Sequence, residues 1–263
     1  MNGPSQQNQP GSYPPNPPGS TSIPGSGQMV SVPMPVVRPA LTYILVGLTV
    51  LIFLGQEYGK YILGNDFLLN LGAKYTPAIL AGEYWRLITP VFLHANELHI
   101  AFNMYALIVL GPGLERQYGH VRFLALYFIS GFAGNVFSFF FSPGVSVGAS
   151  TAIFGLIAAE GIFVYQNRKL FGKRAGAVLR NIITIATINL IIGLSPGIDN
   201  WGHLGGLAGG LLFAWFAGPI WDVEGLYPNI KLVDKREPIQ VQLSAVLVAA
   251  LFAFLAYLRI RRG

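Results

Sequence analysis

Residues 200–210 read NWGHLGGLAGG, and this stretch decides how the chain packs. Glycine stands at positions 202, 206 and 210, so one face of a helix here carries no side chains over about two turns. Overlapping GxxxG steps of this kind allow a second helix to approach at backbone distance inside a membrane. The same stretch places His203 in the first turn. We therefore expect a closely packed helix pair with a polar residue near one end.

A matching face of small residues is present where the chain reads GASTAIFG, from residue 148 to 155. Four small residues spaced by four, three and four positions share one helical face, and they are Gly148, Ala152, Gly155 and Ala159. Packing this face against the glycine stripe brings the first turns of the two helices together. The pattern predicts that Ser150 and His203 meet.

The composition places the chain in a membrane. Of its 263 residues, 52% are hydrophobic and only 11% are charged, which is too apolar for a soluble domain of this size. Apolar stretches long enough to cross about 30 Å of hydrocarbon as a helix recur along the chain. There are seven, near residues 40–56, 97–112, 121–141, 148–166, 179–195, 201–220 and 240–259. The sequence therefore predicts an all-α polytopic membrane protein in contact with the lipid bilayer.

Several classes of chemistry are disfavoured by the residues present. The chain has no cysteine, which excludes disulfides, thiolate catalysis and iron–sulfur centres. The metalloprotease pattern HExxH is absent, and His94 and His99 are five residues apart, off a common helical face. We expect no cofactor and no metal. The seventeen Lys and Arg residues are scattered at helix ends rather than gathered in a stripe, so we expect no nucleic-acid partner.

Three regions differ in composition. Residues 1–38 carry no charge before Arg38 and are rich in Pro, Gly, Ser, Gln and Asn, which predicts a disordered tail and not a signal peptide. Residues 39–220 hold six of the predicted spans, and residues 221–263 a linker and the seventh. The connection of about forty residues between the first two spans is rich in aromatic residues, which predicts short helices at the outer membrane interface.

The distribution of positive charge predicts the orientation. Eleven Lys and Arg residues fall on the side of the N-terminus and six on the other, which favours a cytoplasmic N-terminus in a plasma or inner membrane. Ser150 and His203 then face outward. The C-terminal RIRRG conflicts with this orientation if the seventh helix spans. Either that end is an exception, or the last segment does not cross.

A few polar residues lie within the predicted spans, where they are costly and often functional. His99, Ser150 and His203 fall at nearly the same depth, about one turn below the outer surface, and Asn103 lies four residues after His99 on the same helical face. Taken singly, Ser150 reads as a helix N-cap and the others as interhelical hydrogen-bonding groups. Taken together, they suit a serine nucleophile, a histidine base and two donors for an oxyanion.

Other polar residues fit this site less well. The hydrolase motif GxSxG would need glycine at position 152, where the chain has alanine. Asp199, four residues before His203, is the one acidic residue near enough to orient it, and we favour a Ser–His dyad over a triad. Glu160 lies about 15 Å deeper than Ser150. We expect interhelical hydrogen bonds from Glu160 and from Asn189, with proton transport as the alternative for Glu160.

Four segments appear in the order found in the rhomboid family of intramembrane serine proteases, which this chain resembles over roughly residues 40–220. They are EYWRLITPVFLHANELHIAFNMYAL (83–107), GPGLERQYG (111–119), VGASTAIFGL (147–156) and PGIDNWGHLGGLAGG (196–210). The resemblance implies a six-helix rhomboid core with one additional C-terminal transmembrane helix. It also implies that the pairs Trp85–Arg86 and Glu115–Arg116 are structural.

The resemblance further implies roles at the site. Ser150 would be the nucleophile and His203 the general base, and the oxyanion would be bound by His99, Asn103 and the Ser150 backbone N–H. Thr151 departs from the family, where glycine most often follows the serine. The implied activity is that of a serine endopeptidase cleaving single-span membrane proteins near the outer interface, with substrate entering beside the fifth span. The alternatives are a catalytically silent rhomboid-like binder of membrane proteins and a seven-helix transporter or channel.

Overall fold

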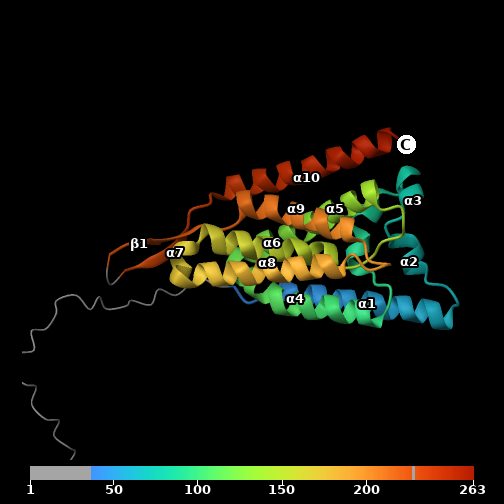
Figure 1. Cartoon of the computed structure of the whole chain (residues 1–263), viewed down its shortest axis with the longest axis horizontal. Coiled ribbons are helices and arrows are strands. Elements are labelled where there is room, and N and C mark those ends of the chain that lie inside the picture. Colours follow the sequence, from blue (N-terminus) through green and yellow to red (C-terminus); the bar gives the residue numbers. More distant parts are fainter. Residues whose placement is uncertain (1–36, 227–228) are drawn as a thin grey trace, which may run out of the picture. The chain divides into compact units, whose positions relative to one another are not determined.

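The computed structural model describes residues 37–226 and 229–263, and all but the last two residues of the predicted tail lie outside these ranges (Figure 1). The described residues form long helices, several short helical segments and one hairpin. The long helices are α1 (Ala40–Ile62), α4 (Glu97–Tyr118), α5 (His120–Phe141), α6 (Ser150–Gln166), α8 (Ala175–Ile192), α9 (Asn200–Ala217) and α10 (Pro238–Arg261). Each overlaps one predicted span, which confirms the all-α polytopic fold.

The long helices differ in how clearly they qualify as membrane spans. Within the described residues, five segments are long and apolar enough to cross a bilayer: α1, α4, α5, residues 168–192 and α10. The α6 helix is apolar but has only 17 residues. The α9 helix has 18 residues and contains glycines, Asn200 and His203, which lower its hydropathy. The chain is an integral membrane protein, and Ser150 and His203 lie on the two long helices that are not among these five segments.

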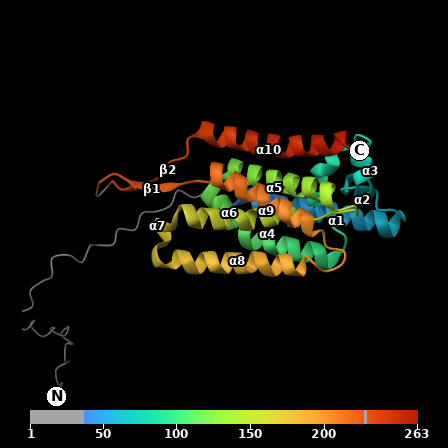
Figure 2. The ribbon, with the colours of Figure 1, turned by 45° about the horizontal axis from the view of Figure 1, so that its top comes forward.

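The α5, α6 and α9 helices form the centre of the bundle. They pack against one another, α4 packs against α1 and α6, α8 packs mainly against α6, and α10 packs against α5 and α9. Figures 1 and 2 show these helices side by side, and in Figure 1 α10 and α1 lie on opposite sides of the centre. The buried side chains of this centre are small or aromatic, as at Ala133, Ala159, Phe163 and Phe213.

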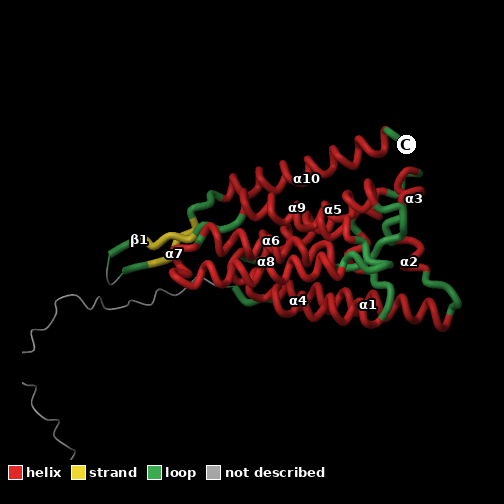
Figure 3. Tube along the Cα trace, viewed as in Figure 1, coloured by secondary structure: helices red, strands yellow, loops and turns green. Residues whose placement is uncertain are grey.

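The segment that joins α1 to α4, residues 63–96, is called the interfacial loop below. It contains the short helices predicted from its aromatic content: α2 (Phe67–Gly72), α3 (Thr76–Leu80), η1 (Tyr84–Leu87) and η2 (Thr89–Phe92). Figure 3 shows α2 and α3 at one end of the bundle, at the same end as the C-terminus.

A hairpin that the sequence analysis missed lies at the opposite end (Figures 1 and 2). Strands β1 (Trp221–Glu224) and β2 (Lys231–Asp234) pair antiparallel, with Trp221 opposite Asp234. Asp234 forms an ion pair with Arg122 at the start of α5. Asn167 at the end of α6 accepts from the Trp221 N–H at 2.7 Å and donates to the Pro219 carbonyl at 3.0 Å. The segment treated as a linker is therefore bonded to the core.

The last helix lies along the bundle for its full length. It buries Val248, Phe252 and Ala256 against the core, and the Arg259 guanidinium lies 5.4 Å from the centre of the Phe139 ring near the end of α5. The C-terminal arginines thus lie at the same end of the bundle as Ser150. Of the two alternatives raised by RIRRG, the length and hydropathy of α10 favour a helix that spans the bilayer.

Candidate active site

The glycine stripe of α9 lies at backbone distance from α6. A methyl group added to Gly206 would lie 2.8 Å from the Thr151 carbonyl carbon, and one added to Gly210 would lie 2.7 Å from the carbonyl carbon of Gly155. Both separations are shorter than carbon–carbon contacts of about 3.5–4.0 Å. Only glycine at these α9 positions permits this approach, which is the packing predicted from the two small-residue faces.

The approach brings Ser150 and His203 together. Ser150 is the first residue of α6, and His203 lies in the first turn of α9. The Ser150 Oγ lies 3.0 Å from His203 Nε2, within hydrogen-bonding distance. Phe154, one turn after Ser150, stacks on the imidazole with ring centres 4.3 Å apart and an interplanar angle of 18°. The hydroxyl and the imidazole are thus held in contact by groups on both helices.

Asp199 serves α9 rather than the imidazole. Its carboxylate accepts from the Gly202 N–H at 3.1 Å, as an N-cap, and from the Ser138 hydroxyl on α5. His203 Nδ1 is buried and has no hydrogen-bond partner among the described residues. The geometry is therefore that of a Ser–His pair, and Asp199 positions the start of the helix that carries His203.

Two further side chains converge on the residues just before Ser150. A methyl group added to Gly148 would lie 2.7 Å from His99 Nε2 and 3.5 Å from Asn103 Nδ2, so both α4 side chains face this backbone. Gly148 has a φ of +128°, a conformation that side chains disfavour. The Asn103 Nδ2 amide is buried without a partner within the described residues. Two polar groups, one of them an unpaired donor, thus lie beside Ser150, where an oxyanion would form.

His94 is a residue that the sequence analysis considered only as a metal ligand. Its Nε2 accepts from the Ala149 N–H at 3.4 Å, and its ring meets the His99 ring edge-on with centres 5.0 Å apart. Burial lowers the pKa of His94 to about 3, so the ring is neutral at physiological pH. Its backbone is held by Gln56, which donates to the His94 carbonyl at 3.1 Å. Within the described residues no group of three or more His, Cys, Asp and Glu side chains could hold a metal ion.

The loop between α5 and α6 is tied to the interfacial loop at several points. The Gly148 N–H donates to the Pro90 carbonyl at 2.9 Å, and Lys74 and Ser146 exchange backbone hydrogen bonds of 3.0 and 3.1 Å. The buried Lys74 ammonium donates to the carbonyls of Ser142 at 2.7 Å and Gly144 at 2.6 Å. Burial lowers the pKa of Lys74. These bonds fix the path of the chain into Ser150.

The interhelical hydrogen bonds predicted for Asn189 and Glu160 are both absent from the described residues. Asn189 is exposed on α8 and donates to the Ile185 carbonyl of its own helix at 2.8 Å, so the predicted interhelical bond is wrong. α8 lies at the edge of the bundle, and this side chain has no neighbouring helix to contact. The Glu160 carboxyl likewise makes no hydrogen bond to another helix among the described residues.

Glu115 and Arg86, one residue from each pair that the resemblance implies is structural, make such contacts. Glu115 on α4 accepts from the Leu41 and Thr42 N–H groups at 2.8 and 2.7 Å, and so caps the start of α1. Arg86 donates to the Ala73 and Asn70 carbonyls at 2.9 and 2.8 Å, inside the interfacial loop.

With this geometry in view, the comparisons with known proteins place the chain in a family. The family model of the Rhomboid domain matches residues 81–220, more than half of the chain. The chain belongs to the rhomboid family.

Three relatives indicate the range of similarity. The chain is 40% identical over 222 residues to rhomboid protease GluP of Bacillus subtilis (strain 168), covering 84% of this chain and 41% of GluP. It is 43% identical over 134 residues to RHOMBOID-like protein 1 of Arabidopsis thaliana, covering 51% of this chain and 34% of that protein. It is 40% identical over 151 residues to rhomboid-like protease 1 of Toxoplasma gondii, covering 54% of this chain and 50% of that protein. The chain spans half or less of the length of these relatives.

Proposed function

We propose that the chain is an intramembrane serine endopeptidase that cleaves transmembrane segments of single-span membrane proteins through a Ser150–His203 dyad. The observation that carries this proposal is the 3.0 Å separation of the Ser150 hydroxyl and the His203 imidazole, near one end of a membrane-spanning bundle. Two relatives named as proteases support it.

The reaction follows from the positions of the side chains. Ser150 Oγ attacks a peptide carbonyl carbon while its proton passes to His203 Nε2. The carbonyl oxygen becomes an oxyanion that accepts hydrogen bonds from Asn103, His99 and the Ser150 N–H. When the C–N bond breaks, His203 returns the proton to the leaving amine. Water then attacks the acyl-enzyme by the same route and releases the acid.

Substrate access is proposed to lie beside α8. In this helix only Ala175, at the end remote from Ser150, is buried, and residues such as Ile188 and Ile191 are exposed. A methyl group added to Gly193, just after α8, would lie 3.2 Å from His203 Nδ1. A loosely packed helix therefore ends next to the imidazole. Its displacement would admit a substrate segment from the bilayer.

The orientation proposed is a cytoplasmic N-terminus, with the Ser150 end facing outward in a plasma or inner membrane. The excess of Lys and Arg at the opposite end of the bundle supports it. Cleavage then occurs near the outer interface, where water reaches the acyl-enzyme.

The test is cleavage of a panel of single-span proteins in liposomes. The native chain should release discrete fragments, and Ser150→Ala and His203→Ala should each abolish this cleavage. Ser195→Ala, an exposed serine in the loop before α9, is the matched control and should cleave normally. Equal cleavage by the native chain and His203→Ala would overturn the assigned base. Stable binding of single-span proteins by a folded native chain that never cleaves them would favour the silent rhomboid-like binder.

A further inference from the structure

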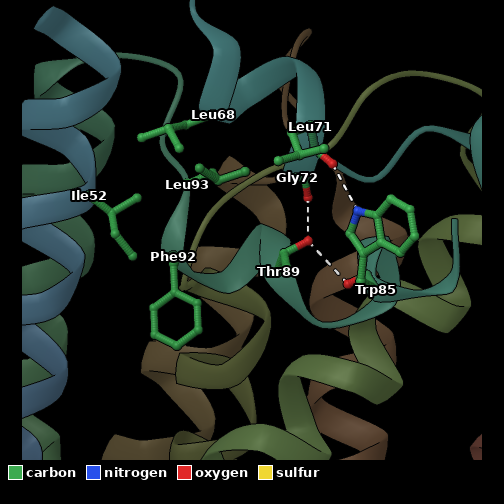
Figure 4. Close-up of a pocket in the computed structure, with 8 residues that line it drawn as sticks. All are labelled: Ile52, Leu68, Leu71, Gly72, Trp85, Thr89, Phe92 and Leu93. Atoms are coloured by element: carbon green, nitrogen blue, oxygen red, sulfur yellow. Dashed lines mark hydrogen bonds between the residues drawn. The ribbon is translucent and has the colours of Figure 1, made fainter. Parts of the chain in front are cut away.

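An apolar pocket of about 410 Å³ lies between α1 and the interfacial loop (Figure 4). Its volume is within the range of about 300–1,000 Å³ typical of small-molecule sites. Ile52 on α1 forms one side, the end of α2 lies above, and the segment from Trp85 to Leu93 forms the other side. The lining residues are Ile52, Leu68, Leu71, Gly72, Trp85, Thr89, Phe92 and Leu93.

The few polar groups at this pocket are already bonded. The Thr89 hydroxyl donates to the Gly72 carbonyl at 2.6 Å, and the Trp85 indole N–H donates to the Leu71 carbonyl at 3.0 Å (Figure 4). These bonds use both side-chain donors in the lining. A peptide segment or a polar ligand would leave its own donors and acceptors unpaired here, which is costly. A hydrocarbon chain has no such groups.

The pocket is continuous with the surface that α1 presents to the membrane. Its rim residues Leu71 and Trp85 are 60% and 46% exposed, and Leu51 beside Ile52 is 65% exposed. Ile52 precedes the end of α1 by ten residues, which places it about 15 Å below that end. This depth corresponds to the acyl region of a bilayer leaflet. The pocket therefore opens where lipid chains are available.

The wall formed by residues 89–93 also faces the candidate active site. Pro90, within this wall, accepts the Gly148 N–H at 2.9 Å, two residues before Ser150. His94 follows the wall directly and accepts the Ala149 N–H at 3.4 Å. An occupant of the pocket would therefore contact the same segment that makes these bonds.

We propose that the pocket binds one acyl chain of a membrane phospholipid, and that the bound chain holds residues 89–93 against the loop that precedes Ser150. The binding step is independent of catalysis. Its effect on cleavage rests on the proposed function.

The binding is tested in detergent micelles by titrating phosphatidylcholine that carries bromine in mid-chain, which quenches tryptophan fluorescence on contact. The quenching of Trp85 itself is obtained by subtracting the fluorescence quenching measured in Trp85→Phe from that measured in the native chain. The expected result is saturable quenching of Trp85 at a low mole fraction of lipid. Unbrominated phosphatidylcholine should compete for the site and reverse the quenching in the native chain. This competition tests the binding without any substitution in the pocket.

A matched pair of variants locates the site. Ile52→Phe fills the pocket from α1, and Leu51→Phe makes the same change at the adjacent exposed position. The added ring occupies space that the acyl chain would fill, so the half-saturating lipid concentration should rise about tenfold, equivalent to about 1.4 kcal/mol, in Ile52→Phe. It should be unchanged in Leu51→Phe. Quenching that rises in proportion to bulk lipid, or is equal in Ile52→Phe and the native chain, would overturn the proposal. The proposal would also be overturned if a brominated substrate segment quenched Trp85 saturably and the brominated lipid did not.

The effect on the active site is read in the same micelles. Added phosphatidylcholine should raise the cleavage rate of the native chain and of Leu51→Phe, and raise it less in Ile52→Phe. An equal rise in cleavage rate in the native chain, Leu51→Phe and Ile52→Phe would refute the proposed effect of the bound chain on the loop before Ser150. The quenching experiment is repeated in Ser150→Ala, where saturable binding should persist because it does not need catalysis. If the native chain binds the lipid saturably but never cleaves a substrate, the proposed function is refuted and the lipid site is not.

Discussion

Replacing Gly206 by alanine should separate Ser150 from His203. The added methyl group would lie 2.8 Å from the carbonyl carbon of Thr151 and 3.1 Å from its Cα. Because carbon atoms pack at about 3.5–4.0 Å, α9 must move away from α6 by roughly 0.7–1.2 Å. The Ser150–His203 distance of 3.0 Å then passes the limit of about 3.5 Å for a hydrogen bond.

The consequence is a loss of catalysis larger than the loss of stability. General base catalysis contributes about 10²–10⁴-fold, so kcat/KM for a transmembrane substrate should fall by about 100-fold or more. Overpacking should lower the free energy of unfolding by about 1–3 kcal/mol. Both are measured on purified protein, with cleavage normalised to the fraction folded at the assay temperature.

Gly47→Ala on α1 is the matched control, since no atom lies within 4 Å of its added methyl group. It should keep full activity and gain about 0.5–1 kcal/mol of stability. Gly206→Ala with native kcat/KM and native reactivity toward a fluorophosphonate would refute the argument that backbone contact between α6 and α9 sets the dyad distance.

Three further variants test the groups around the site. Asp199→Asn keeps an N-cap and should lose less than about tenfold in kcat/KM, because Asp199 does not bond His203, whereas a loss of about 10⁴-fold would indicate a triad. Lys74→Met leaves two carbonyls unpaired and should lower the free energy of unfolding by about 1–3 kcal/mol, measured by thermal denaturation. Lys60→Met, at an exposed position on α1, is a near-neutral control, and equal melting temperatures for the two variants would contradict this prediction. The pKa of His94 falls from 6.5 unfolded to about 3 folded, so the unfolded chain binds the extra proton between these values and stability falls as pH decreases through this window. His94→Gln should therefore show a smaller drop in melting temperature between about pH 7 and about pH 4, and an unchanged drop would refute the assignment.

The pairing of α6 and α9 could be predicted because glycine spacing encodes it directly. A helix face without side chains has few partners other than a second small-residue face, and the positions of Ser150 and His203 within their helices follow from the chain. The pattern of apolar stretches fixed the number of long helices for a similar reason, since length and hydropathy alone limit what spans a bilayer.

Other features depend on contacts that no single segment reveals. Phe154 is one apolar residue among many in α6, and its stacking on His203 depends on how the two helices are rotated. His94 acts through a backbone N–H fifty-five residues away. The strands at residues 221–224 and 231–234 have only four residues each, too few for an alternating pattern to stand out from a linker. Asn189 was assigned a partner helix that α8 does not have on that side.

The central claim is that His203 activates Ser150 as a nucleophile within the membrane. The most direct measurement is to treat the folded protein with a fluorophosphonate and map the adduct by tandem mass spectrometry. We expect one phosphonylated residue, Ser150, with the rate of adduct formation reduced about 10²-fold or more in His203→Ala. An adduct on another residue, or equal rates in the native chain and His203→Ala, would contradict the claim.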